Sequence, residues 1–157
     1  MSVAAQPASP TITTFFLTHT SFQVGAEPTP LTAAGSEGSP MTARVHPVPR
    51  GSAFKYRLTA AAAVTIRIHR RLAGRRAGGH CLTATRARRR LPRCTRLLLR
   101  GVLHRQAKAG TNTEPFSGRI GRTRLRPGRY RAAIAPVVAS GQRAPAARLA
   151  RFTILPG

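Results

Sequence analysis

Aspartate is absent from this 157-residue chain, and its acidic side chains are limited to Glu27, Glu37 and Glu114. Glycoside hydrolysis, Ser-His-Asp relays and two-metal phosphoryl transfer each need acidic groups that converge on one cleft. Two of the three glutamates lie in a stretch rich in Gly, Pro and Ser, and Glu114 stands alone. We therefore expect a non-catalytic protein with no catalytic residues, no metal site and no cofactor.

Long apolar runs and tryptophan are also missing. No run of about 18 apolar residues occurs, which excludes a transmembrane helix. Residues 1–10 carry no basic residue and the apolar cluster 15–17 is too short for the core of a signal peptide, so the usual export signal is not visible. Aromatic residues make up 5% of the chain, so few stacking platforms for nucleic-acid bases are available.

Positive charge is what the chain has in excess. It contains 27 Lys and Arg against 3 acidic residues, a formal net charge of +24, and only Lys55 and Lys108 are lysines. A field of this sign attracts nucleic acid, anionic wall polymers and acidic polysaccharides without choosing among them. Charge therefore predicts that the partner is a polyanion, but not which polyanion. It does not predict the oligomeric state.

Alternation of apolar and polar residues predicts strands. Phe54, Tyr56 and Leu58 alternate with basic residues, and the β-branched residues of 64–69 alternate with polar ones. The helix candidate 82–100 is interrupted by Pro92 and has no apolar stripe at helical spacing. The segments with strand character are 12–17, 54–58, 64–69, 96–100, 114–117, 129–134 and 151–154. We predict an all-β protein, an antiparallel β-sandwich of about seven strands.

The length suits one folded domain. We expect a flexible, disordered N-terminal tail at 1–10 and a sandwich domain at 11–157. Within that domain, the composition predicts long loops at 25–52 and at 73–95, the second being a basic insertion.

A turn motif precedes one of the strands. In Leu125-Arg126-Pro127-Gly128-Arg129-Tyr130, Pro127 and Gly128 favour a turn and Tyr130 begins the strand. This resembles the tyrosine corner of immunoglobulin-like and fibronectin type III-like sandwiches, in which the tyrosine hydroxyl bonds to backbone a few residues upstream. The alternative is a core tyrosine in an ordinary hairpin.

The wider pattern resembles immunoglobulin-like domains of secreted and surface proteins of actinobacteria and related bacteria. The resemblance covers about residues 11–155. It implies a spacer, display or adhesion module located outside the cell or at its surface. Where that family often has an Asp and a Gly-Asn pair, residues 138–142 have neither, which argues against calcium at this loop. The segments that carry the resemblance are 54–58, 64–68, Cys81 with Cys94, 108–112, 116–121, 125–130 and 151–154.

Cys81 and Cys94 are the two cysteines of the chain. A disulfide between them would close a short loop, stabilise the fold by about 3 kcal/mol in the chain-entropy account, and indicate an oxidising compartment. A zinc site with His80 and His104 fits poorly because no C-x-x-C spacing is present. Two free thiols, and a Cys-His nucleophile in this Arg-rich region, are the other interpretations.

Arginine occupies the polar positions of the predicted strands, so several arginines are expected to share outer sheet faces. A second basic group is the run 86–90. We therefore expect polyanions to bind at Arg57, Arg67, Arg86, Arg88, Arg89, Arg90, Arg129 and Arg131, with Arg151 beside them.

Three functions are compatible with these features of the sequence. The first is a non-catalytic extracellular or surface structural or adhesion module that binds anionic polymers through its basic surface. The second is an intracellular nucleic-acid-binding protein, which would explain the charge but lacks recognisable helix-turn-helix, zinc-finger or RNA-recognition motifs. The third is an accessory domain of a secreted hydrolase.

Overall fold

Strands account for nearly all of the regular structure in the computed structural model, which describes residues 9–34, 48–139, 141 and 144–157. A single 3-10 turn, η1 (Arg86–Arg88), is the only helical segment in those ranges. No helix among the described residues has the length and hydropathy to cross a bilayer. The strands are β1 (Ile12–Leu17), β2 (Ser21–Phe22), β3 (Thr32–Ala34), β4 (Ser52–Leu58), β5 (Ala62–Ala77), β6 (His80–Thr83), β7 (Arg93–Ala107), β8 (Gly110–Phe116), β9 (Arg119–Ile120), β10 (Thr123–Arg124), β11 (Gly128–Pro136) and β12 (Arg148–Ile154).

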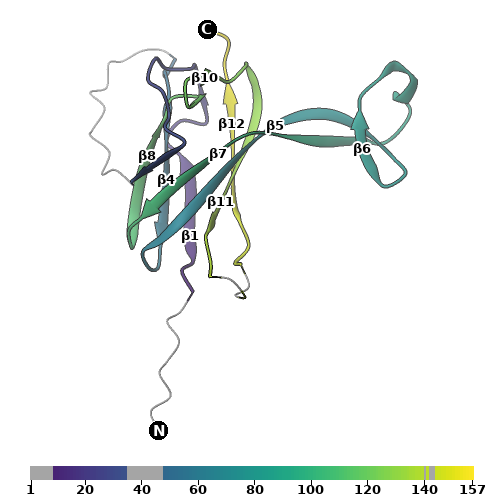
Figure 1. Ribbon diagram of the computed structural model, residues 1–157. Helices are drawn as coiled ribbons and strands as arrows, with labels where there is room; N and C mark the ends of the chain where they lie inside the picture. Colours follow the sequence, from purple (N-terminus) through teal and green to yellow (C-terminus); the bar gives the residue numbers. More distant parts are fainter. Residues whose placement is uncertain (1–8, 35–47, 140, 142–143) are drawn as a thin grey trace.

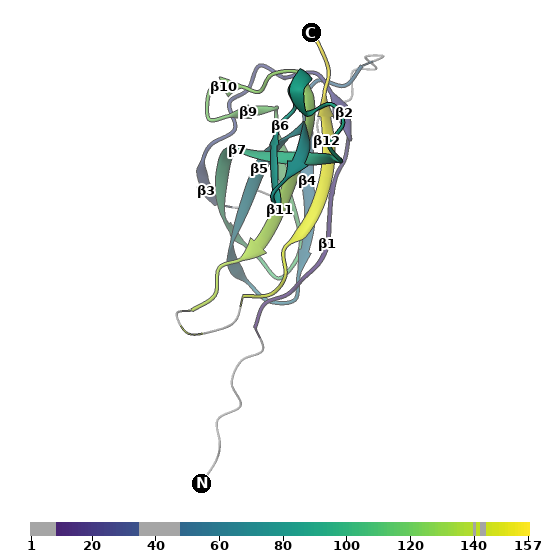
Figure 2. The same cartoon turned by 90° about the vertical axis from the view of Figure 1, so that its right-hand side faces the viewer.

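Two principal sheets face each other across the core (Figures 1 and 2). The small sheet has the antiparallel order β1-β4-β8. The large sheet has the order β2-β12-β11-β5-β7-β3, with β6 paired to β5. The short strands β9 and β10 form a separate hairpin. The all-β prediction is therefore confirmed at the level of fold class.

The alternating residues fill the core as their period requires. Phe54 of β4 and Phe116 of β8 stack with ring centroids 4.8 Å apart on the small sheet. From the large sheet, Phe152 meets Phe54 edge-on and stacks on Tyr130 at 5.3 Å. All four rings are buried, and such aromatic packing adds to the stabilisation from buried area.

Each of the seven segments expected to be strands coincides with or overlaps a strand. The arrangement departs from a purely antiparallel one, because β2 runs parallel to β12 and β3 runs parallel to β7. These strands of two and three residues reach the sheet edges from loops and not through hairpins, so nothing imposes antiparallel pairing on them. Residues 1–8 of the expected tail and 35–47 of the expected 25–52 loop, with Glu37 and His46, lie outside the described residues.

The expectation of a loop at 73–95 is wrong. The strand β11 pairs with β5 only as far as Arg71, but β5 and β7 stay paired beyond the sandwich to Arg75 and Arg93. We call residues 72–96 the arm; it projects to one side of the body in Figure 1, with β6 paired along β5. The alternation that marks strands elsewhere is weak here because a projecting ribbon has no core to cover, so apolar residues are not needed on either face.

Candidate anion-binding surface

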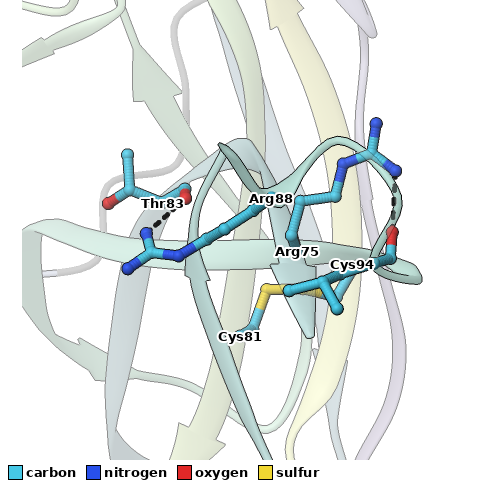
Figure 3. The surroundings of a disulfide bond; sticks show 6 residues. Arg75, Cys81, Thr83, Arg88 and Cys94 are labelled. Carbon is cyan, nitrogen blue, oxygen red and sulfur yellow. Dashed lines mark hydrogen bonds between the residues drawn. A yellow bond between two sulfur atoms is a disulfide. The ribbon is translucent and has the colours of Figure 1, made fainter. Parts of the chain in front are cut away.

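A disulfide joins the outer strands of the arm. Cys81 of β6 and Cys94 of β7 are bonded with an S–S distance of 2.05 Å, and β5 lies between these two strands (Figure 3). Both sulfur atoms are engaged, so the free-thiol, Cys-His and zinc interpretations are wrong. The described residues contain no group of three or more potential metal ligands.

Two arginines bond to the backbone of the arm near the disulfide. Arg75 Nη1 donates to the Leu91 carbonyl at 2.9 Å, and Arg88 Nη1 donates to the Thr83 carbonyl at 2.9 Å (Figure 3). The arm carries eight arginines and no acidic residue. These hydrogen bonds and the disulfide together hold a strongly cationic element in one shape.

The outer face of the large sheet is lined with arginine. Because Ile66, Ile68, Tyr130 and Ala132 point into the core, the residues between them point outward. We call the outward set the arginine face: Arg67 and Arg71 of β5, Arg129 and Arg131 of β11, and Arg151 of β12.

Arginines on this side of the molecule lie directly opposite one another on neighbouring strands. The register pairs Arg71 with Arg129, Arg131 with Arg151, and, on the arm, Arg75 with Arg93. Directly opposed side chains on a sheet are near neighbours, and like charges in that position are destabilising. Three such pairs form a surface that an anion would stabilise.

No carboxylate compensates this charge in the described part of the chain. Its only ion pair joins Arg105 to Glu114, and both side chains are buried. Glu27 is exposed and forms no ion pair there. Within the described ranges, the charge of the arginine face is therefore left to solvent ions or to a bound partner.

The pKa of His69 is sensitive to the charge of the arginine face. It lies opposite Arg131 in the register. Partial burial, and then the charges of Arg131 and Arg67, lower the pKa of the His69 imidazole. His69 Nδ1 and Arg131 Nε are also buried without a hydrogen-bond partner among the described residues. An anion bound beside Arg131 would offset the positive charge that contributes to this lowering.

One hollow lies where the arginine face meets the arm, and a second lies on the arginine face beside β12 and the start of β2. The larger, of about 480 Å³, has Arg71, Arg75, Arg93 and Arg129 in its walls. The smaller, of about 270 Å³, adds Arg151 to Arg71 and Arg129. Arg71 and Arg129 line both hollows, so five arginines border two adjacent hollows.

The structure groups only part of the candidate residues. Arg67, Arg129 and Arg131 share the arginine face, whereas Arg57 lies on β4 of the opposite sheet. The remaining candidates, Arg86, Arg88, Arg89 and Arg90, lie at the end of the arm in and after η1. Sequence reasoning missed Arg71, Arg75 and Arg93 because strand pairing past residue 70 was not expected. Positions 67, 71 and 75 fall on the same face of a strand, and this spacing was the signal from which Arg71 and Arg75 could have been identified.

Another polar cluster lies in the core and has a structural role. Arg105 Nε contacts Glu114 Oε2 at 3.2 Å, and Tyr56 donates to Glu114 Oε1 at 3.4 Å. Burial raises the pKa of the Glu114 carboxyl against the opposing effect of Arg105, and burial also raises the pKa of Tyr56. Arg105 Nη2 further donates to the Pro30 carbonyl at 2.7 Å, which fastens the segment before β3 to β7.

The turn before β11 contains the hydrogen bond expected of a tyrosine corner. Tyr130 donates its hydroxyl to the Arg126 carbonyl, four residues upstream, at 2.5 Å. Leu125 is buried, and Arg70 Nη2 donates to the Pro127 carbonyl at 3.1 Å. The turn through Gly128 thus lies next to the start of the arm.

Comparisons with family models, with curated proteins and with solved structures found no match to this chain, so the surface itself carries the functional argument.

Proposed function

We propose that this protein is a non-catalytic structural or adhesion module that binds anionic polymers through the arginine face and the arm. The observation that carries the proposal is the set of three cross-strand arginine pairs with no carboxylate beside them among the described residues. Like charges directly opposite one another on a sheet are destabilising, and a bound polyanion would offset all three pairs at once.

The proposal extends to the type of sandwich and its location. The Tyr130 hydrogen bond and the two facing sheets support an immunoglobulin-like domain. The Cys81–Cys94 disulfide supports an oxidising compartment, and hence the cell surface or the extracellular space. A folded domain whose cationic arm is held by a disulfide is suited to binding an anionic wall or matrix.

A nucleic-acid-binding protein is the second candidate, and the shape of the arm favours it. Projecting β-ribbons can enter the major groove of DNA, and the end of this arm, in which β6 and β7 flank β5, is basic. No aromatic side chain is interleaved with the arginines of the arm to stack on bases, however. We therefore expect any DNA binding to be insensitive to sequence and strongly weakened by salt.

The test is a binding series with the whole chain. Fluorescently labelled linear polyphosphate, polyglutamate, double-stranded DNA and uncharged dextran are titrated with the protein at several salt concentrations. We expect the polyanions to bind with affinities that fall with salt, and dextran not to bind. Failure of every polyanion to bind at low salt would remove the proposed function.

A second measurement separates the two candidates. Alkylation of free thiols before and after reduction, in protein recovered from its native host, reads the state of Cys81 and Cys94 by mass. An oxidised pair supports the surface module. A fully reduced pair in the host would contradict the proposed location and favour the nucleic-acid candidate.

A further inference from the structure

We infer that the two hollows that share Arg71 and Arg129 form a track that holds one extended chain of phosphate groups. This inference rests on the proposed function and narrows it to a place and a ligand chemistry. The track runs from Arg75 and Arg93 on the arm, past Arg71 and Arg129, to Arg151 on β12.

The arginines along the track lie in two rows across the strands. The pair Arg75–Arg93 and the pair Arg71–Arg129 are separated by four residues along β5, or about 13 Å at about 3.3 Å per residue. A flexible chain with several charges can lie across the hollows and contact both pairs at once.

Small side chains form the floor between the two rows. Ala73 and Thr95 are directly opposite each other in the register, and both line the larger hollow together with Gly74. Long side chains at these positions would fill the space between the arginine pairs. The larger hollow is therefore not filled between the two arginine pairs, which suits a linear ligand.

Opposed arginine pairs favour phosphate over carboxylate. One guanidinium can occupy both oxygens of a planar carboxylate with its two parallel N–H donors. A tetrahedral phosphate directs its oxygens to more than one side, so two guanidinium groups from neighbouring strands can bind it together. Each cross-strand pair of the track presents two such groups toward one region.

The test compares two double variants that lose the same charge. Arg71→Gln with Arg129→Gln removes the row shared by both hollows. The control, Arg50→Gln with Arg122→Gln, removes two exposed arginines that line neither hollow. Linear polyphosphate and polyglutamate of matched charge are titrated by calorimetry at one fixed salt concentration, and polyphosphate is repeated over a salt series.

We expect the track variant to weaken polyphosphate binding by about tenfold or more and to reduce the slope of log affinity against log salt by about two, because two phosphate contacts are lost. The control variant should change the affinity by less than about threefold, as a long-range charge effect alone would. The unfolding midpoint of the track variant without ligand should equal or exceed that of the wild type, since a repulsive pair is removed.

Equal losses in the two double variants would overturn the track, while polyanion binding by the wild type would leave the proposed function standing. Wild-type affinity for polyglutamate equal to that for polyphosphate would overturn the phosphate assignment. If the wild-type protein binds neither polymer, both the proposed function and the track are wrong.

Discussion

Gly74 of β5 lies directly under the disulfide, and a Cβ atom at this position would come within 2.5 Å of the Cys81 sulfur. The same Cβ would lie 2.8 Å from Arg96 Cγ and 2.9 Å from the Leu82 carbonyl oxygen. Real Cβ atoms do not approach neighbours so closely. The bond between β6 and β7 therefore crosses β5 at the one residue that offers no side chain.

We predict that Gly74→Val prevents complete formation of the Cys81–Cys94 disulfide, because the added side chain would overlap the Cys81 sulfur. The measurement is the fraction of alkylatable thiol in purified, air-oxidised protein, read by mass. Ala73→Val is the matched control, because Ala73 is exposed and lies on the other face of the same strand. Complete oxidation of both variants would show that β6 can shift to make room.

Replacement of Glu114 by leucine should destabilise the fold by about 3–5 kcal/mol, because it leaves the Arg105 guanidinium buried without its carboxylate. Glu114→Gln keeps a hydrogen-bond acceptor and should cost less. Glu27→Gln, at an exposed position, should leave the urea midpoint unchanged. Equal midpoints for the leucine variant and the wild type would mean that Arg105 reaches solvent when its partner is removed.

Tyr130→Phe should lower the free energy of unfolding by about 1 kcal/mol, the usual net contribution of one buried hydrogen bond. The lost bond is the one to the Arg126 carbonyl. The ring itself stays stacked on Phe152, so packing is preserved. Urea unfolding measures the change, and a midpoint identical to that of the wild type would remove the corner role from Tyr130.

His69 makes stability depend on pH in one direction. Its pKa in the folded protein lies below the ordinary value near 6.5. As the pH falls below about 6.5, the unfolded chain binds a proton that the folded chain does not, so stability decreases; the decrease ends below the folded pKa. His69→Gln should therefore lose less stability than the wild type between about pH 7.5 and about pH 5 in urea unfolding. An equal loss in both proteins would assign the pH dependence to other groups.

Binding of a polyanion should raise the pKa of His69, because it offsets the charges of Arg131 and Arg67 that lower it. The measurement is an NMR titration of the imidazole protons with and without linear polyphosphate. His19 is exposed, on the segment between β1 and β2, and serves as an internal reference in the same spectra. A pKa of His69 unchanged by bound polyphosphate would place the ligand away from the arginine face.

Strand positions were readable from the sequence wherever one strand face covers the core. In β4 and at the start of β5, buried residues such as Phe54 and Ile66 alternate with partly buried or exposed ones, so the apolar–polar alternation follows the burial. The very short strands β2 and β3 gave no such pattern, because two or three residues are too few to show a period.

The candidate site was predictable only in part. Arg67, Arg129 and Arg131 were placed on outer sheet faces by alternation alone. Arg71 was missed because the strand continues past the predicted 64–69, and Arg75 because the arm extends beyond the core. Arg57 was included although it lies on the opposite sheet. Period-2 alternation tells which face of its own strand a residue occupies, but not which strand lies beside it.

Composition and alternation by themselves determined an all-β chain with an overwhelming positive charge and a single possible pairing of cysteines, since these properties are local or additive along the sequence. The tertiary structure decided which arginines meet. The register brings Arg71 to Arg129 and Arg75 to Arg93, and the passage of the disulfide over Gly74 joins β6 to β7. Those relationships depend on strand order and register. Packing between distant segments sets both, so the sequence of a single segment does not reveal them.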